Sequence, residues 1–500
     1  MIESMLNERK QTAKSLVIVG AGGAIGQIAT VLFNPILTRL YTPESYGQWA
    51  LLLSLALLAT TISSLRYELA ILLPDTHEEA ANVLAWSILV SLILALGTLC
   101  SISLLHNFLV GSLGLHSLAG WLWWIPALVV ATGIYQSSIS WCTRMKDFAY
   151  FSLALATLPL LTISVQIFAA LNGWQDARGL FLGSLLGQIG ATCVMVAIIT
   201  YNYHSFILKS LSWRLTWQMM IRYKNYALYM TPYSLIGMIR NRMAVLILSS
   251  VGATIQVGYY AFSERVVRLP GNFISDSVRP IFFQKAAKNK LKTLEPAILE
   301  SLLLINRWAT PFFVLFVFEA FELFAIIFGE EWRNAGLYGI ILAFPAFVLL
   351  HTNWLDRGLD VLGRQNLAFQ LEAFFSVLSV CFLIFGVYVL QTVFYGVLLQ
   401  AMVFLAYNIC WCVTFFKVAE FRIKNLWVLA GQCLIIAAVC SALYLVLEWA
   451  FPTRVAIIVY LLLAGLAVAQ RLKKEWVKLN LKVTALETAN KNDSFSPDQA

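Results

Sequence analysis

Apolar segments long enough to cross a lipid bilayer recur along the whole chain. About fourteen runs of roughly 20 residues alternate with short polar stretches. Their approximate limits are 15–38, 45–65, 80–105, 118–140, 150–171, 179–200, 227–249, 256–280, 301–328, 335–353, 367–390, 393–416, 426–448 and 454–470. Only 12% of the 500 residues are charged, about half the share in an average soluble chain. The sequence therefore predicts an all-α membrane protein with about 14 transmembrane helices and excludes a water-soluble multidomain protein.

Positive charges are concentrated in alternate loops between these segments. If the N-terminus is cytoplasmic, the cytoplasmic loops and tails hold 25 of the 35 Lys and Arg. The opposite loops hold only Arg39, Arg178, Arg333 and Arg454. This asymmetry fixes the orientation of membrane proteins, so we expect both termini in the cytoplasm. The net charge of +9 then requires no nucleic-acid partner.

A short repeat indicates two related halves. "SYGQWA" begins at Ser45 and "QVGYYA" at Gln256, so glycine, an aromatic residue and alanine recur at one offset. Six expected spans separate the copies, which therefore cross the membrane in the same direction. The repeat predicts two pseudo-symmetric six-helix bundles plus two extra C-terminal helices, an arrangement in which transporters bind substrate between the halves. The expected parts are an N-terminal six-helix lobe (1–203), a cytoplasmic interfacial linker helix (204–225), a C-terminal six-helix lobe (226–418), two additional transmembrane helices (419–472) and a partly disordered cytoplasmic tail (473–500).

A glycine-rich stretch near the N-terminus looks superficially like a dinucleotide-binding loop. In "SLVIVGAGGAIGQ" the apolar run continues beyond Gln27, whereas a nucleotide site needs an amphipathic helix and a second strand. Gly22 and Gly26 lie four residues apart and instead predict a close helix–helix contact.

The eighth apolar segment carries charges on one face. Arg265, Arg268, Asn272, Asp276 and Arg279 fall within about 80° of one another on a helix, with Glu264 at the edge. Placing an arginine at bilayer depth costs roughly 2.5 to 3.5 kcal/mol, so such a cluster is expected to line a hydrated cavity. Pro270 and Gly271 interrupt this helix and predict a hinge.

The seventh segment adds Arg240 and Arg242, of which Arg240 is expected to face the same cavity. Ion pairs within the eighth segment are the alternative interpretation, but its two acids cannot neutralise five arginines. About three positive charges remain, and guanidinium groups match phosphate oxygens well. The cluster therefore predicts an anionic substrate such as a pyrophosphate. Glu264 and Asp276 are candidates for coupling to Na⁺ or H⁺.

Other charges within the apolar segments have simpler explanations. Arg66 is next but one to Glu68, which predicts a local ion pair, and the orientation of Arg39, Arg66 and Arg242 relative to the cavity stays open. Glu319 and Glu322 are expected near the outer membrane surface. No cluster of residues suggests a metal site or a bound cofactor.

Three features together carry a family resemblance. They are "NPILTRLYTPESYGQWALLLSLALLATTISSLRYELAILLP" at Asn34–Pro74, "VGYYAFSERVVRLPGNFISDSVRPIFFQKAAK" at Val257–Lys288, and the layout of about fourteen spans. The chain resembles the polysaccharide-unit (O-antigen) flippase family of the multidrug, oligosaccharidyl-lipid and polysaccharide exporter superfamily. The last two spans look like those of flippases for lipid-linked peptidoglycan precursors, but the first helix lacks the charged residues found mid-helix in them.

The resemblance implies a function and a location. Such relatives move an undecaprenyl-pyrophosphate-linked oligosaccharide across the bacterial inner (plasma) membrane, and place arginines in a central cavity that Arg240, Arg265, Arg268 and Arg279 would match. Polysaccharide polymerase and chain-length proteins would be partners, and the membrane potential would assist transport. A drug or cation exporter of the same superfamily is the alternative. A membrane polysaccharide polymerase or ligase is disfavoured, because the longest outer loop, near 106–118, has no charged residue apart from histidine.

Overall fold

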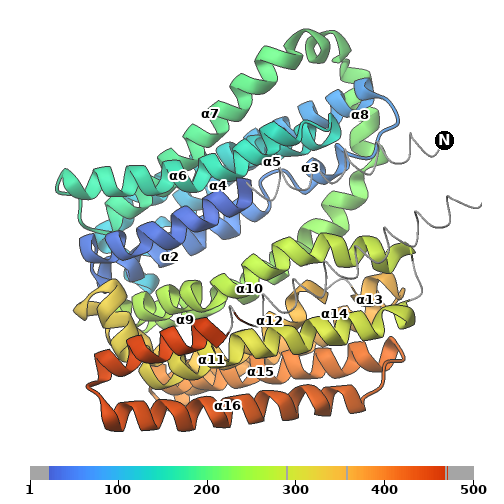
Figure 1. The fold of residues 1–500 in the computed structure, drawn as a ribbon. Coiled ribbons are helices and arrows are strands. Elements are labelled where there is room, and N and C mark those ends of the chain that lie inside the picture. Colours follow the sequence, from blue (N-terminus) through green and yellow to red (C-terminus); the bar gives the residue numbers. More distant parts are fainter. Residues whose placement is uncertain (1–21, 289–290, 356–357, 468–469, 471–500) are drawn as a thin grey trace, which may run out of the picture. The chain divides into compact units, whose positions relative to one another are not determined.

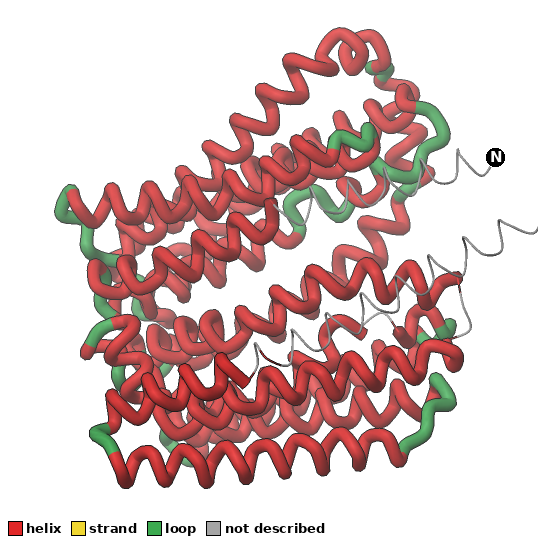
Figure 2. The backbone as a smooth tube through the Cα atoms, viewed as in Figure 1, coloured by secondary structure: helices red, strands yellow, loops and turns green. Residues whose placement is uncertain are grey.

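Helices make up the regular structure of the protein. The computed structural model describes residues 22–288, 291–355, 358–467 and 470, and these residues form helices, turns and loops without any strand (Figures 1 and 2). After a first helix over residues 22–40, the helices are α2 (Pro43–Thr61), α3 (Tyr67–Ala70), α4 (His77–Leu113), α5 (Ile125–Arg144), α6 (Phe148–Leu171), α7 (Ala177–Ser210), α8 (Trp213–Arg222), α9 (Thr231–Ser250), α10 (Thr254–Lys288), α11 (Glu295–Phe328), α12 (Ala335–Thr352), α13 (Gly358–Val361), α14 (Gln365–Ile384), α15 (Val393–Val418) and α16 (Lys424–Ala450), followed by a helix at Thr453–Ala467. Short 3-10 helices lie at His116–Trp124, Leu291–Leu294, Glu330–Trp332 and Asn353–Leu355, and π-helical turns at Tyr226–Met230 and Phe385–Val389.

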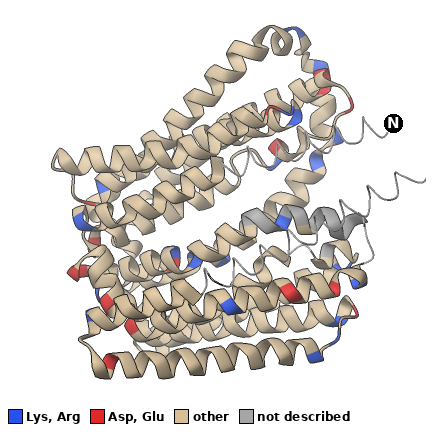
Figure 3. Ribbon diagram, in the orientation of Figure 1, with Lys and Arg blue, Asp and Glu red and all other residues tan. Residues whose placement is uncertain are grey.

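The predicted all-α membrane fold is confirmed. The described part of each of the fourteen expected segments overlaps a helix. Within the described ranges, nine helical segments are long and apolar enough to cross a membrane, so the count of fourteen spans is not itself established. Helices α9 and α10 are not among the nine. They carry the arginine cluster, whereas charged residues are sparse along most of the other helices (Figure 3).

Local sequence signals set several helix ends. Helix α2 begins after Thr42, whose hydroxyl accepts a hydrogen bond from the Ser45 amide at 3.3 Å, and Pro43 occupies the first turn. Helix α4 begins after Thr76, which caps the Glu79 amide in the same way at 3.2 Å. It ends at Gly114, whose φ of +67° favours glycine.

The chain divides into two compact units. The first contains residues up to Ala287 and Phe321–Cys412, and the second contains Lys288–Ala320 and the residues from Val413 onward. In the first unit, α4 packs on α5, and α5 and α6 both pack on α7 (Figure 1). The predicted lobes at 1–203 and 226–418 stay predictions.

The first helix packs closely against α6, as its glycines predict. A Cβ added to Gly22 would lie 2.2 Å from the Ser152 carbonyl oxygen, and one added to Gly26 would lie 2.9 Å from the Leu155 carbonyl oxygen. Larger residues would push the two helices apart, so the interpretation of these glycines as packing residues is confirmed.

Polar contacts also hold α11 to α16 within the second unit. The Asn306 side chain donates a hydrogen bond to the Leu429 carbonyl oxygen at 2.9 Å, and the Tyr444 hydroxyl donates to Glu319. Glu319 is only 7% exposed and lies where α11 has a non-helical residue conformation. The expected surface position of Glu319 is therefore wrong, because the carboxylate is satisfied inside the helix pair.

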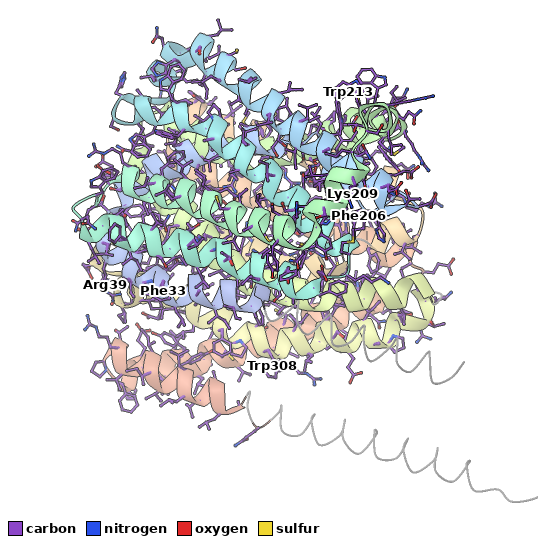
Figure 4. All side chains as sticks on the ribbon, turned by 90° about the horizontal axis from the view of Figure 1, so that it is seen from above. Phe33, Arg39, Phe206, Lys209, Trp213 and Trp308 are labelled. Atoms are coloured by element: carbon purple, nitrogen blue, oxygen red, sulfur yellow. The ribbon has the colours of Figure 1, made fainter. Side chains whose placement is uncertain are left out.

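The expected linker helix at 204–225 consists of two pieces. Helix α7 continues to Ser210, the chain turns at 211–212, and α8 follows. The Asn82 side chain accepts hydrogen bonds from the Ser212 amide and the Thr216 hydroxyl, and donates one to the Ser210 carbonyl oxygen. This clamp fixes the turn on α4. Trp213 at the start of α8 is 70% exposed (Figure 4), as in a helix that lies at a membrane surface.

Candidate functional site: the arginines of α9 and α10

Arg240 on α9 is paired with an acid from a different helix. Its guanidinium forms an ion pair with Glu372 on α14, and it also donates to the Asn241 side chain at 3.2 Å. The Tyr407 hydroxyl of α15 donates a second hydrogen bond to Glu372 at 2.6 Å. The side chains of Arg240 and Glu372 are 21% and 26% exposed, so both can be reached from outside the protein.

Arg268 on α10 is paired with an acid of its own helix. It contacts Glu264 one turn earlier at 2.9 Å, which is one of the pairings the alternative interpretation expected. Arg268 also acts electrostatically on Arg240, so the two ion pairs belong to one charged cluster. Asn272, one turn further along α10, is exposed.

Arg265 and Arg242 have no ion-pair partner among the described side chains. Arg265 is half-buried and interacts electrostatically with Tyr46 on α2, whose hydroxyl is buried without a hydrogen-bond partner. Arg242 is half-buried too, and its Nε atom is buried without a hydrogen-bond partner. It interacts with the Tyr260 hydroxyl, as does Arg268, so Arg242 belongs to the same charged region.

Arg279 lies further along α10 and contacts a different part of the protein. Its guanidinium donates to the Asn353 carbonyl oxygen at 3.0 Å and to the Asn353 side-chain oxygen at 3.2 Å. The side chain of Asp276 is not among those that the structure describes, so the predicted role of Asp276 stays a prediction. The structure thus links Arg240, Arg242 and Arg268 through electrostatic interactions and places Arg265 beside Tyr46. Arg279 is attached to Asn353, the first residue of the 3-10 helix after α12.

The balance of charges differs from the sequence-based count. Sequence reasoning counted only the acids of the eighth segment, whereas Glu372 approaches from α14. Among the described side chains, Glu372 and Glu264 pair with Arg240 and Arg268, whereas Arg242 and Arg265 have no ion-pair partner. A surplus of guanidinium groups persists, and it attracts anions.

Two residues of this cluster were missed by sequence reasoning. Glu372 sits inside the apolar segment 367–390 and Tyr407 inside 393–416. An acid within an expected span is itself a signal of function, because burying an unpaired carboxylate in lipid is costly. Nothing in the sequence, however, indicates that α9, α14 and α15 bring these residues together.

Pro270 and Gly271 lie inside a continuous helix. Helix α10 continues through both residues, and a Cβ added to Gly271 would meet no atom within 4 Å. The hinge role stays a prediction.

Arg66 pairs with Glu68 at 3.3 Å, as expected, and donates a hydrogen bond to Ser234 of α9 at 2.9 Å.

The two glycines of the sequence repeat touch each other. A Cβ added to Gly47 would lie 2.0 Å from the Thr254 carbonyl oxygen and 3.0 Å from the Gly258 nitrogen. A Cβ added to Gly258 would lie 1.9 Å from the Pro43 carbonyl oxygen. The two segments of the repeat therefore pack directly on each other, whereas the predicted symmetry of two halves stays a prediction.

An aromatic cluster surrounds the glycine contact. The ring of Tyr46 packs edge-on against Trp332 and Phe262, with centroid distances of 4.9 and 5.6 Å. Trp332 also donates a hydrogen bond to the Thr38 carbonyl oxygen at 2.9 Å, and Arg39 donates to the Ile326 carbonyl oxygen at 3.2 Å. The N-terminal and C-terminal halves are therefore joined at the end where α2 and α10 begin. Arg39 is exposed at this end, outside the arginine cluster.

The sequence of residues 36–336 matches the model of a family described as polysaccharide biosynthesis proteins. The chain belongs to this family. No curated protein sequence matches it. The polysaccharide biosynthesis family member described here nevertheless has the fold of solved membrane transporters, at low sequence identity.

Three solved structures illustrate that fold. The lipid II flippase MurJ in an inward closed conformation has a TM-score of 0.65 at 14% identity, covering 93% of this chain and 100% of that chain. The MATE multidrug transporter DinF-BH has a TM-score of 0.58 at 15% identity, covering 82% and 97%. The Vibrio cholerae MATE transporter VcmN has a TM-score of 0.51 at 15% identity, covering 83% and 98%.

Proposed function

We propose that this protein flips an undecaprenyl-pyrophosphate-linked oligosaccharide, a repeat unit of O-antigen or of another polysaccharide, from the cytoplasmic to the outer leaflet of a bacterial inner membrane. The observation that carries the proposal is the surplus of arginines over acids on α9 and α10, in a member of a polysaccharide biosynthesis family with a flippase-like fold. The process makes and breaks no covalent bond, so the protein is a transporter and not an enzyme.

The proposed mechanism separates the two ends of the substrate. The polyprenyl tail stays in lipid, while the pyrophosphate and sugars pass between the halves by alternating access. Arg240, Arg265 and Arg268 replace water around the phosphate oxygens, and the exposed Asn272 contacts sugar hydroxyls. Arg279 would join them only after leaving Asn353, and Pro270 with Gly271 would allow α10 to bend.

Coupling to an ion gradient and to other proteins completes the proposal. Glu264 is a candidate for H⁺ or Na⁺ coupling because it already pairs with a substrate-binding arginine, Arg268. Asp276 is the second candidate. On the outer side the product would pass to polysaccharide polymerase and chain-length proteins.

A drug or cation exporter is the second candidate function, and the fold shared with DinF-BH favours it. A cation would have to bind beside arginines that outnumber the neighbouring acids, which is electrostatically unfavourable. Accumulation of a cationic dye in a deletion strain, with unchanged surface polysaccharide, would support the exporter and contradict the flippase.

The decisive test combines genetics with reconstitution. A deletion strain should accumulate a lipid-linked glycan on the cytoplasmic leaflet, and the wild-type gene should restore surface polysaccharide. Purified protein in proteoliposomes should then move that extracted glycolipid between leaflets. Normal surface polysaccharide in the deletion strain, together with no flipping by the purified protein, would contradict the proposed function.

A further inference from the structure

Glu372 occupies the position that an anionic headgroup needs in order to reach Arg240. The carboxylate pairs with the guanidinium from α14 and holds the Tyr407 hydrogen bond at 2.6 Å. A guanidinium already bound to a carboxylate cannot offer the same N–H groups to a phosphate oxygen. The Nη1 atom of Arg240 faces Glu372, and its Nε and Nη2 atoms face the Asn241 side chain. A phosphate that binds through Nη1 therefore competes with Glu372.

We propose that Glu372 is a displaceable internal anion: the substrate phosphate takes its place on Arg240, and the released carboxylate takes up one proton from water. This inference rests on the proposed function and names the residue that couples substrate binding to protons. The step balances in charge, because one carboxylate leaves the guanidinium, one phosphate anion arrives, and one H⁺ converts the carboxylate into a neutral acid.

The surroundings of Glu372 explain why displacement leads to protonation. Among the described side chains, Arg240 is the cation paired with Glu372, and Tyr407 donates to it from α15. Arg268 and Tyr233 act electrostatically on Arg240, and Arg268 is already paired with Glu264. Once the phosphate neutralises Arg240, an ionised Glu372 would be a like charge beside the substrate in an apolar segment. Protonation removes both the repulsion and the cost of the unpaired charge.

The pair is accessible enough for this exchange. About a quarter of the Glu372 side chain and a fifth of the Arg240 side chain are exposed, so neither partner is fully enclosed by the protein. The buried pair of Glu319 and Tyr444 offers a comparison, because it also joins a glutamate to a tyrosine but belongs to the second unit, on α11 and α16.

The experiment measures proton uptake on binding of a soluble polyprenyl pyrophosphate. Purified full-length protein in nanodiscs is titrated with farnesyl pyrophosphate at neutral pH, in two buffers that differ in ionisation enthalpy. The wild type should take up about one proton for each molecule bound. Glu372→Gln should bind about tenfold more tightly, because no ion pair has to be broken, and should take up none. Glu319→Gln should behave like the wild type.

A second variant keeps the test valid if Glu372→Gln folds poorly. Tyr407→Phe removes one hydrogen bond to the ionised Glu372, so Glu372 of the empty protein should become protonated at a higher pH than in the wild type. As the pH is lowered, proton uptake on binding should therefore disappear at a higher pH than in the wild type. Binding without proton uptake by the wild type, or unchanged uptake in Glu372→Gln, would overturn the inference alone. Absence of binding by wild type and Glu372→Gln alike would contradict the proposed function, and the internal-anion role with it.

Discussion

Individual arginines of the cluster differ in how they are satisfied, and the difference predicts their mutants. Arg265 lacks an ion-pair partner among the described side chains, and Arg268 is paired with Glu264 of the preceding turn of the same helix. Among the described side chains, neither forms an ion pair with another helix, so truncation should remove substrate binding with little effect on folding. We predict that Arg265→Ala and Arg268→Ala abolish surface polysaccharide at normal protein level, as measured by glycan staining and immunoblotting.

The exposed Lys209 near the C-terminal end of α7 provides a control for that prediction, because it is basic but lies outside α9 and α10 (Figure 4). Lys209→Ala should leave surface polysaccharide normal. Full polysaccharide in both arginine variants would remove the phosphate-binding role of α10.

Arg240 differs, because its ion pair joins α9 to α14. Arg240→Gln leaves the Glu372 carboxylate without its cation and should destabilise the protein by about 1.5 to 3 kcal/mol, seen as a lower apparent Tm. The double variant Arg240→Gln with Glu372→Gln should recover most of that stability, since neither charge remains. It should still fail to transport. A double variant as unstable as the single one would show that the ion pair does not hold these helices together.

At the scale of helices, the contact between Gly47 and Gly258 predicts a steric effect on conformation. Alanine at Gly258 would place a methyl group 1.9 Å from the Pro43 carbonyl oxygen, so α2 and α10 would have to separate. We predict that Gly258→Ala and Gly47→Ala weaken closure at this end. Cysteines introduced at exposed positions beside it should then be labelled faster by a membrane-impermeant thiol reagent. Labelling rates equal to those of the unsubstituted background would contradict the prediction.

Gly271 gives the opposite case within the same helix. A methyl group there meets no atom within 4 Å, so Gly271→Ala has no steric cost and should stabilise α10 by about 0.5 to 1 kcal/mol. If Pro270 and Gly271 form the hinge, the stiffer helix should slow flipping in proteoliposomes while Tm stays equal or rises. An unchanged flipping rate with a raised Tm would assign the bend to another position.

The sequence predicts helices and their limits well, because the bilayer requires long apolar runs whatever their neighbours are. It also predicts the packing of Gly22 and Gly26, since small residues four positions apart in a membrane helix allow a neighbouring helix to approach closely. The sequence does not predict the ion-pair partner of Arg240. Glu372 lies 132 positions further along the chain, and only the packing of α9 on α14 brings the two charges together. Glu319 was misjudged for the same reason, because Tyr444 satisfies it from α16.

For the whole molecule, the surplus of guanidinium charge predicts a dependence on membrane potential. A cell interior that is electrically negative favours outward movement of an anionic pyrophosphate and inward return of the empty, positively charged site. Each elementary charge that crosses the full potential gains about 2.3 kcal/mol per 100 mV. Flipping by oriented proteoliposomes should therefore accelerate when valinomycin and a potassium gradient make the cytoplasmic side negative, and slow when the gradient is reversed. Arg265→Gln carries one charge fewer, so whatever residual flipping it supports should depend less steeply on voltage. Equal rates at both polarities would contradict the net outward transfer of negative charge in each cycle, on which this prediction rests.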